Sequence, residues 1–234
     1  MTTQTVSSGV TSSGLTENFG DQLIVVNGGV ASATNVSGGL VAVSSGGSTV
    51  STRLSSGGSS IGQEVISSGG SATGTVVLSG GVETVLSGGS AINANVSGGF
   101  MQLGTPAISA TPASAGGTAT GTVIDGGGVE VVLNGGVDSG ATIRSGSLGV
   151  SSGGLSISAT ASAVSSGALA IVSVQGGVAS ATTIGSGGLL AISSGGVVVN
   201  ETILAGGSVF VDNGGVYTLS ASRNAQNISI ASGG

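Results

Sequence analysis

Residues 176–215 read GGVASATTIGS, GGLLAISS, GGVVVNETILA, GGSVFVDN and GG, and this stretch contains the pattern that decides the fold. The glycine pairs begin at positions 176, 187, 195, 206 and 214, so their spacing alternates between 11 and 8. The repeat is therefore about 19 residues long, with two glycine corners and two short apolar-rich arms in each period. A unit of this length cannot bury its own apolar face and must stack on its neighbours, which predicts a solenoid.

The same unit extends along nearly the whole chain. Gly9, Gly20 and Gly28 already show the spacing of 11 and then 8, and later pairs follow at spacings of 8 to 12. The least regular parts are residues 100–116, where a proline corner replaces a glycine pair, and residues 153–176, where a single glycine marks the corner. We therefore predict one solenoid array over residues 1–234, with about twelve coils stacked at roughly 4.8 Å.

Each arm carries one column of branched aliphatic residues. In the long arm this residue follows the first glycine by about eight positions, giving Val36, Leu54, Val65, Val77, Val96, Ile124, Ile143, Ile184 and Ile203. In the short arm it is the fifth residue, giving Val25, Val43, Val85, Leu103, Val132, Ile192 and Val211. Arms of this length between glycine pairs are too short for helices, so we expect each arm to be a strand and the fold to be an all-β parallel β-helix.

The composition supports a folded, β-rich chain. There are 49 glycines but only two prolines and no three-residue glycine period, and 38% of the residues are hydrophobic, which argues against both collagen and disorder. Glycine suits tight corners because it adopts a positive φ without steric cost. The apolar residues are mainly Val, Ile, Leu and Ala, with aromatics at 2%, which predicts a thin core of small side chains.

The charge pattern excludes several kinds of partner. Arg53, Arg144 and Arg223 are the only basic residues, and the formal net charge is −6. Nucleic acids and anionic membrane surfaces both require a positive face on the protein, so we exclude both as partners. No apolar run is long enough for a membrane-spanning helix, so we expect no membrane insertion by this segment.

Neither end of the sequence carries a recognisable export signal. Residues 1–8 lack the basic and apolar regions of a signal peptide, and the sequence ends at residues 232–234 on a repeat corner. We therefore expect a segment of a larger exported protein, or export by a route that uses no such signal. Cysteine is absent, so no disulfide indicates a compartment.

Two columns of small polar residues accompany the corners. The residue before a glycine pair is usually serine or asparagine, and such residues can hydrogen-bond the backbone of a turn. Threonine recurs one or two residues before the long-arm aliphatic residue, and stacked threonines are good strand formers. Turn and strand formation alone can explain both columns.

The repeat resembles that of AIDA-type adhesins, which occur in the passenger domains of self-associating bacterial autotransporters. The most similar stretches are residues 68–89 (SGGSATGTVVLSGGVETVLSGG) and 175–196 (QGGVASATTIGSGGLLAISSGG), and the resemblance is weakest over residues 1–8 and 153–176. It implies a right-handed parallel β-helix at the bacterial cell surface or outside the cell. It also implies a function in self-association, aggregation, biofilm formation or adhesion, with another copy or host and cell-surface glycans or proteins as partners.

The resemblance further implies O-glycosylation of the repeat by a dedicated heptosyltransferase. The candidate acceptors are Ser37, Ser45, Ser56, Ser68, Ser79, Ser87, Ser97, Ser152, Ser186, Ser194, Thr34, Thr75, Thr122, Thr182 and Thr202. An autotransporter signal peptide and C-terminal domain are not recognisable in these residues, so the secretion route stays open.

The residue inventory leaves little scope for catalysis. Histidine, cysteine and lysine are absent, which removes the commonest general bases, a cysteine nucleophile and the usual zinc ligands, so we expect no metal site and no cofactor. Glu64 and Glu83 stand one full repeat apart and could form a glycosidase-type pair or a weak cation site on adjacent coils. We expect instead that each of the nine acids is a solvated surface group, because no aromatic or basic residue accompanies them.

Glu83 and Glu130 pose a separate problem. They occupy the third short-arm position, which elsewhere holds Leu23, Val41, Met101, Leu190 and Val209. A carboxylate buried in that column without a partner would be costly, so we expect both side chains to face outward.

These observations favour a non-enzymatic surface β-solenoid that acts as an adhesin or self-association module. One alternative is a passive stalk or a subunit of an extracellular fibre. Another is a carbohydrate-active β-helix that uses Glu64 and Glu83. Calcium-binding and ice-binding solenoids are disfavoured, because the calcium-binding nonapeptide is absent and the threonine column changes register between coils.

Overall fold

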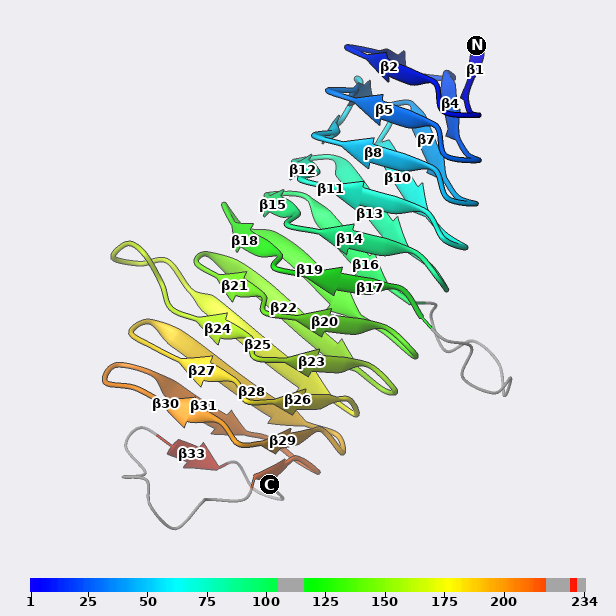
Figure 1. The fold of residues 1–234 in the computed structure, drawn as a ribbon. Helices are drawn as coiled ribbons and strands as arrows, with labels where there is room; N and C mark the ends of the chain where they lie inside the picture. The colour runs from blue at the N-terminus through cyan, green and yellow to red at the C-terminus, as the bar shows by residue number, and fades with distance from the viewer. Residues whose placement is uncertain (105–115, 218–227, 231–234) are drawn as a thin grey trace.

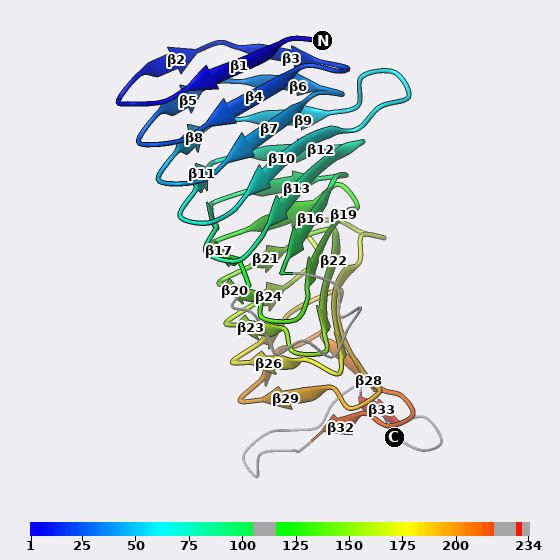
Figure 2. The ribbon, with the colours of Figure 1, turned by 90° about the vertical axis from the view of Figure 1, so that its right-hand side faces the viewer.

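The computed structural model describes residues 1–104, 116–217 and 228–230, which form a β-solenoid of three parallel sheets (Figure 1). Within each sheet nearly every step between neighbours advances by three strands, so the chain completes one coil for every three strands. Glu64 pairs with Glu83 on the next coil, which confirms the predicted period. The coils stack from β1 at one end of the rod to β33 at the other (Figure 2). No described helix is long and apolar enough to cross a membrane.

The short arms form the first sheet, called sheet 1, which contains 12 strands within the described residues. Its strands are β1 (Thr3–Val6), β4 (Gln22–Val25), β7 (Leu40–Val43), β10 (Gly62–Ile66), β13 (Gly81–Val85), β16 (Phe100–Leu103), β19 (Gly128–Val132), β22 (Gly146–Ser151), β25 (Ala170–Gln175), β28 (Gly188–Ser193), β31 (Ser208–Val211) and β33 (Ile228–Ile230).

Each long arm contributes one strand to sheet 2 and one to sheet 3. Sheet 2 contains β2 (Thr11–Ser13), β5 (Val30–Ser32), β8 (Ser48–Val50), β11 (Ser71–Thr73), β14 (Ser90–Ile92), β17 (Thr118–Thr120), β20 (Val137–Ser139), β23 (Leu155–Ile157), β26 (Val178–Ser180), β29 (Val197–Val199) and β32 (Val216–Tyr217). Sheet 3 contains β3 (Thr16–Asn18), β6 (Asn35–Ser37), β9 (Arg53–Ser55), β12 (Val76–Leu78), β15 (Asn95–Ser97), β18 (Val123–Asp125), β21 (Thr142–Ile143), β24 (Thr160–Ala161), β27 (Thr183–Ile184) and β30 (Thr202–Ile203).

The division of the long arm into two strands corrects the expectation of one strand per arm. One residue at this third corner has a positive φ in each coil: Gly14, Ala33, Ser51, Gly74, Asn93, Gly121, Gly140, Ser158, Ala181 and Asn200. Its N–H donates to a carbonyl of the next coil, as Ala33 does to Val50 at 2.9 Å. Because four residue types share this position, glycine spacing gives no sign of the corner.

The two glycines of a pair have different physical roles. At the corner before β5, Asn27 and Gly28 have φ values of 52° and 76°, as a type I′ turn requires, and Gly29 N–H donates to Val26 O at 2.9 Å. Gly29 has no positive φ, but a Cβ on it would lie 2.2 Å from Val6 O of the preceding coil. The first glycine is therefore required by backbone conformation, and the second by the close approach of the previous coil.

The interior is filled by the two predicted aliphatic columns. The short-arm residues Val25, Val43, Val85, Leu103, Val132, Ile192 and Val211 are at most 2% exposed, and the long-arm residues Val36, Leu54, Val77, Val96, Ile124, Ile143 and Ile184 are at most 1% exposed. Ile203 packs against this core while partly buried. The prediction for Val65 is wrong, because Glu64 and Ile66 point inward on β10 and Val65 lies on the outer side.

The register change at Val65 comes from an extra hairpin. Gly57 and Ser60 form an antiparallel bridge, with Gly57 N–H donating to Ser60 O at 2.8 Å and Ser60 N–H donating to Gly57 O at 3.3 Å. The irregular segment at 153–176 keeps strands β23, β24 and β25, with residues 162–169 as a connection between the last two. Most of the irregular segment at 100–116, including its proline corner at 106, lies outside the described residues.

The different roles of paired glycines can be tested at the corner before β29. Gly196→Ala should destabilise the protein severely, because its Cβ would lie 2.2 Å from Val174 O of the preceding coil. Gly195→Ala should lower the free energy of unfolding by only about 1–2 kcal/mol, the cost of a left-handed φ in a residue with a side chain. Its Cβ would meet nothing within 4 Å. Urea denaturation of the two variants checks this, and equal losses would contradict it.

Candidate functional site

The acidic residues gather inside the solenoid. Contrary to the expectation of solvated acids, six of the nine acids are at most 1% exposed: Glu17, Glu64, Glu83, Glu130, Asp138 and Glu201. The expected outward orientation of Glu83 and Glu130 is therefore wrong. The period of two along a strand fixes this result, because Glu83 and Val85 share the inner face of β13. The inward column of sheet 1 holds Glu64, Glu83, Met101 and Glu130 on four successive coils.

Glu64 is stabilised by three threonine hydroxyls. Thr49 from sheet 2 donates to Oε1 at 2.7 Å, and Thr52 donates to the same oxygen at 3.2 Å. Thr75 donates to Oε2 at 2.9 Å. Thr52 and Thr75 directly follow the third corner of their coils, so the corner places their hydroxyls inside the rod. These bonds offset part of the desolvation of the carboxyl group, although burial still raises its pKa above the usual range.

Glu83 has no such support. Neither carboxyl oxygen of Glu83 has a hydrogen-bond partner among the described residues. Burial raises its pKa well above the usual range, and the neighbouring Glu64 raises it further, while the Thr75 hydroxyl acts weakly in the opposite direction. Burial therefore disfavours the charged form of Glu83 more strongly than that of Glu64, whose carboxyl group accepts three hydroxyl hydrogen bonds.

A second group of interior acids lies three coils beyond Glu64. Glu130 on β19 and Asp138 on β20 belong to the same coil, and Ser156 Oγ donates to Asp138 Oδ2 at 3.0 Å. Burial, Asp138 and Glu83 together raise the pKa of Glu130 well above the usual range. Burial raises the pKa of Asp138 to about 7, against the opposing effect of Ser156. Nearer the C-terminal end, Tyr217 donates to Glu201 Oε1 at 3.2 Å.

This geometry argues against the carbohydrate-active alternative. Glu64 and Glu83 do lie on adjacent coils, as their spacing predicts, and their Cα atoms are paired in the sheet. Both side chains are 0% exposed, however, and strands of neighbouring coils cover them. A saccharide cannot reach carboxyl groups that are enclosed by the solenoid wall, so the pair contributes to the core and offers no substrate site.

The candidate glycosylation acceptors separate into two groups by exposure. Ser45, Ser56, Ser68, Ser79, Ser87, Ser152, Ser186 and Ser194 are exposed at the corners, and Ser37, Ser97 and Thr202 are half-buried. Thr34, Thr75, Thr122 and Thr182 are at most 1% exposed and follow the third corner on the inner side. A transferase cannot reach these four threonines in the folded chain, so we leave them out of the proposed acceptor set.

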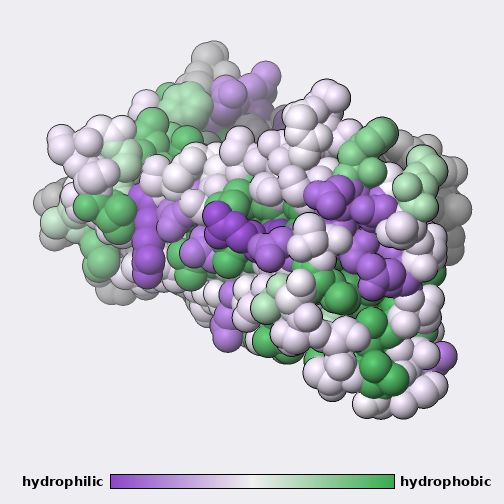
Figure 3. Space-filling view, turned by 90° about the horizontal axis from the view of Figure 1, so that it is seen from above, coloured by the Kyte–Doolittle hydropathy of each residue, from purple (hydrophilic) through white to green (hydrophobic). Residues whose placement is uncertain are grey.

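The outer surface is weakly polar. Seen from the N-terminal end of the rod, small hydrophilic and hydrophobic groups are interspersed among residues of near-neutral hydropathy (Figure 3). Among the described residues the ion pair is that between the Met1 amino nitrogen and Asp21 Oδ1, which are 3.8 Å apart. Most of the described surface therefore has too few charged groups to attract a partner by electrostatics.

Sheet 2 carries a continuous apolar column on its outer face. Val137, Leu155, Val178, Val197 and Val216 are paired in register on successive coils. We call these five residues the valine ridge. Val178, Val197 and Val216 are 38%, 40% and 58% exposed. In the N-terminal half, the same column contains Ser48, Ser71, Ser90 and Thr118. The ridge was not predicted from the sequence, because it becomes visible only when the outward positions of sheet 2 are aligned coil by coil.

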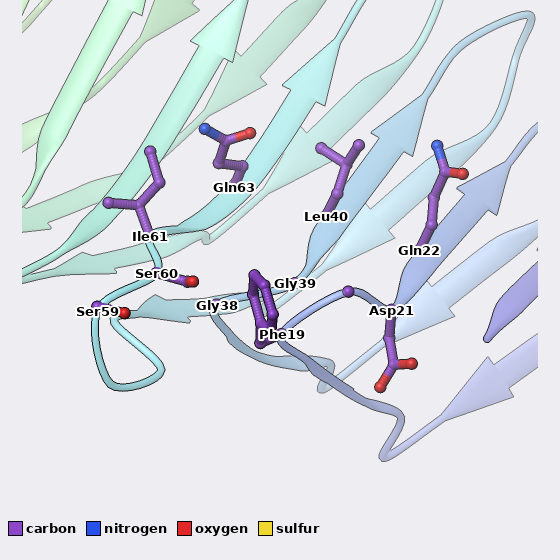
Figure 4. Close-up of a pocket in the computed structure, with 11 residues that line it drawn as sticks. Phe19, Asp21, Gln22, Gly38, Gly39, Leu40, Ser59, Ser60, Ile61 and Gln63 are labelled. Carbon is purple, nitrogen blue, oxygen red and sulfur yellow. The ribbon is translucent and has the colours of Figure 1, made fainter. Parts of the chain in front are cut away.

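A notch of about 510 Å³ lies at the edge of sheet 1 near the N-terminal end. Phe19 lies beside Gly38 and Gly39, with the hairpin residues Ser59 to Ile61 on one side and Asp21 on the other (Figure 4). Gln22, Leu40 and Gln63 project side by side from three strands. The register of β4, β7 and β10 aligns these three residues. Sequence reasoning missed this site, since its residues come from three coils and an irregular hairpin.

Three parallel sheets, an enclosed interior and one sequence repeat per coil define a β-solenoid repeat protein. No protein-family model matches the chain, and no match was found among curated protein sequences. Among solved structures, it is similar to a TibC-catalysed hyper-glycosylated fragment of TibA, residues 55–350 of that protein. The identity is 32% and the TM-score 0.59, over 99% of this chain and 90% of that one. The similarity supports the resemblance to an adhesin-like repeat.

The buried acids predict an unusual dependence of stability on pH. An acid whose pKa is higher in the folded state binds protons more tightly there, so stability is greatest at low pH and falls as pH rises from the unfolded pKa towards the folded one. For Asp138 this window extends from about pH 4 to about 7. The raised pKa values of Glu83 and Glu130 change stability in the same direction. Urea denaturation should therefore show a higher midpoint at pH 5 than at pH 8, and a higher midpoint at pH 8 would contradict the assignment.

Replacing Glu83 by methionine and replacing Glu64 by methionine should change the free energy of unfolding in opposite directions. Glu83→Met should raise the free energy of unfolding at pH 8 by about 1–3 kcal/mol, because it removes a buried acid without a partner. Met101 already occupies the same column on the next coil. Glu64→Met should be destabilising, since three threonine hydroxyls lose their acceptor. Denaturation at pH 8 measures both, and a stability loss in Glu83→Met would overturn this account.

Proposed function

We propose that the chain is a self-associating, adhesin-like module exposed at a bacterial surface or outside the cell, and that the valine ridge binds a second copy. The ridge is the observation that carries the proposal. Contiguous exposed apolar residues on a soluble protein mark interaction surfaces. Here Val178, Val197 and Val216 are each more than a third exposed and stand in register on one parallel sheet.

A second copy of the chain is the partner that best fits the ridge, because the ridge is long, narrow and uncharged. Ile157 and Val199 widen it on the same outer face, at 36% and 41% exposure. Two rods aligned along their lengths would place apolar columns against each other, so that each coil adds a further contact to the interface. The similarity to the TibA fragment and the resemblance to AIDA-type repeats support this role.

Glycosylation of the corners is a second proposal. The TibA fragment was hyper-glycosylated by TibC. In this chain the exposed serines lie at the glycine corners of many coils. A transferase that recognises the repeated corner could therefore modify many coils in the same way, and the sugars would extend outward from the edges of the rod.

Adding charge to the ridge should abolish self-association. In the double variant Val178→Lys/Val197→Lys, two cations would interrupt the apolar contact, and the concentration-dependent increase in mass seen by light scattering should disappear. The matched control is Ser71→Lys/Ser90→Lys, which adds the same charge to the equivalent outward column of sheet 2. The control should associate like the parent chain.

Two outcomes would contradict the proposal that the valine ridge binds a second copy. Equal association of both double variants would show that the contact lies elsewhere on the rod. A parent chain that stays monomeric at all concentrations would favour a passive stalk or a subunit of a fibre built by other contacts. Negative-stain microscopy on the same samples distinguishes paired rods from end-to-end filaments.

The glycosylation proposal predicts which hydroxyls are modified. After co-expression with TibC, peptide mass spectrometry should find sugars on exposed corner serines such as Ser68, Ser87 and Ser194. Thr75 and Thr182 should stay unmodified, because their hydroxyls are enclosed. An unchanged intact mass would remove the proposal for this transferase, and sugars on the buried threonines would show that modification precedes folding.

A further inference from the structure

The notch beside Phe19 combines an exposed aromatic ring with unpaired amide groups. Phe19 is 71% exposed, more than Phe210, the other exposed phenylalanine at 38%. Gln22 and Gln63 are half-buried, and neither side chain forms a hydrogen bond with another described residue. Leu40 lies between the two glutamines in the sheet register. The site thus presents an apolar surface with free donors and acceptors on both sides of it.

The walls of the notch are held in place by backbone contacts. The hairpin closes through the two Gly57–Ser60 hydrogen bonds, and Gly58 has a φ of 66° at its first central position, as a type II′ turn requires. A Cβ at Gly38 would lie 3.1 Å from Ser60 Cβ, so the hairpin packs directly against the glycine corner of the neighbouring coil. The notch is therefore preformed, which reduces the entropic cost of binding.

The opposite wall is fixed by Asp21. Its Oδ1 accepts hydrogen bonds from Thr2 N–H and Thr2 Oγ1, both at 2.8 Å, and its Oδ2 accepts one from Asn18 N–H at 3.3 Å. These bonds lower the pKa of Asp21. In Figure 4 the carboxylate points away from Gln22 and Gln63, so it supports the turn that carries Phe19. The lining contains no basic residue, which disfavours an anionic ligand.

We propose that this notch binds a neutral oligosaccharide. The C–H groups on one face of a sugar ring carry partial positive charge and pack on the negative face of an aromatic ring such as Phe19. The amide groups of Gln22 and Gln63 can each donate to and accept from sugar hydroxyls. The two glutamines are two strand spacings apart, about 9–10 Å, so a ligand longer than one sugar ring is needed to contact both. The volume of about 510 Å³ is in the range of small-molecule sites.

The site lies on a different sheet from the valine ridge, so its test is independent of self-association. Isothermal titration of the full chain would use neutral trisaccharides of glucose, galactose, mannose and N-acetylglucosamine, with a sialylated trisaccharide as the charged comparison. A parallel arm would use neutral glycans carried on a glycoprotein, to distinguish free from protein-linked sugar. Binding of a neutral member in either arm is expected, with weaker binding of the sialylated one.

Variants then locate the binding. Phe19→Ala and Gln63→Ala should each weaken binding by roughly tenfold or more, as expected for loss of one stacking or hydrogen-bonding group. Phe210→Ala is the matched control, because it removes an exposed phenylalanine from sheet 1 outside the notch, and it should bind like the parent chain. Equal melting temperatures would confirm that the variants remain folded. Side-chain amide NMR signals of Gln22 and Gln63 should also shift on addition of the bound trisaccharide.

Three outcomes would overturn the proposal. The first is the absence of binding by any neutral member at millimolar concentration in both arms. The second is equal affinity of Phe19→Ala and Phe210→Ala, which would place the sugar elsewhere. The third is preferential binding of the sialylated comparison, which would contradict the uncharged chemistry of the notch.

Discussion

The close approach of each coil to the previous one is the constraint on which the rest of the structure depends. At the second glycine of a pair, the carbonyl of the preceding coil lies so near that a Cβ would stand 2.1 Å from it at Gly47 and 2.2 Å from it at Gly196. This contact aligns the corners, and the aligned corners set the strand register of all three sheets. The register in turn stacks equivalent residues in columns, so that a single position is repeated along the rod.

The columns explain why the interior contains acids without basic partners. A side chain on the inner face of sheet 1 has only the facing sheets and the third corner as neighbours, and near Glu64 and Glu83 those positions hold uncharged residues such as Ala72, Thr75 and Ala91. Glu64 is therefore stabilised by hydroxyl groups, whereas burial and the neighbouring Glu64 raise the pKa of Glu83 and favour its neutral form. Such an interior lowers the stability of the fold as the pH rises.

The fold could be predicted from the sequence because glycine spacing records the two corners that need glycine. The third corner could not, because Ala33, Asn93 and Gly121 satisfy it equally well and leave no periodic signal. The same gap misled the interpretation of the threonine column, whose orientation depends on that corner. The orientation of Glu83 was predicted wrongly because an energetic preference was placed above the alternation of side chains along a strand. In β13 the alternation prevails, since reversing it would expose Val85.

Sites on the outer surface are harder to predict from sequence than the fold, for a related reason. Outward positions make few contacts that the stack requires, so Ser71 and Val197 occupy equivalent places on sheet 2 with the same backbone pairing. The repeat therefore constrains the interior residues and leaves the outer ones free to differ from coil to coil. A ridge arises where several neighbouring coils share one kind of outward residue, and a notch arises where one coil departs from the repeat, as at the hairpin of Gly57 and Ser60. Functional surfaces in such a rod are consequently properties of groups of coils, and no single repeat contains them.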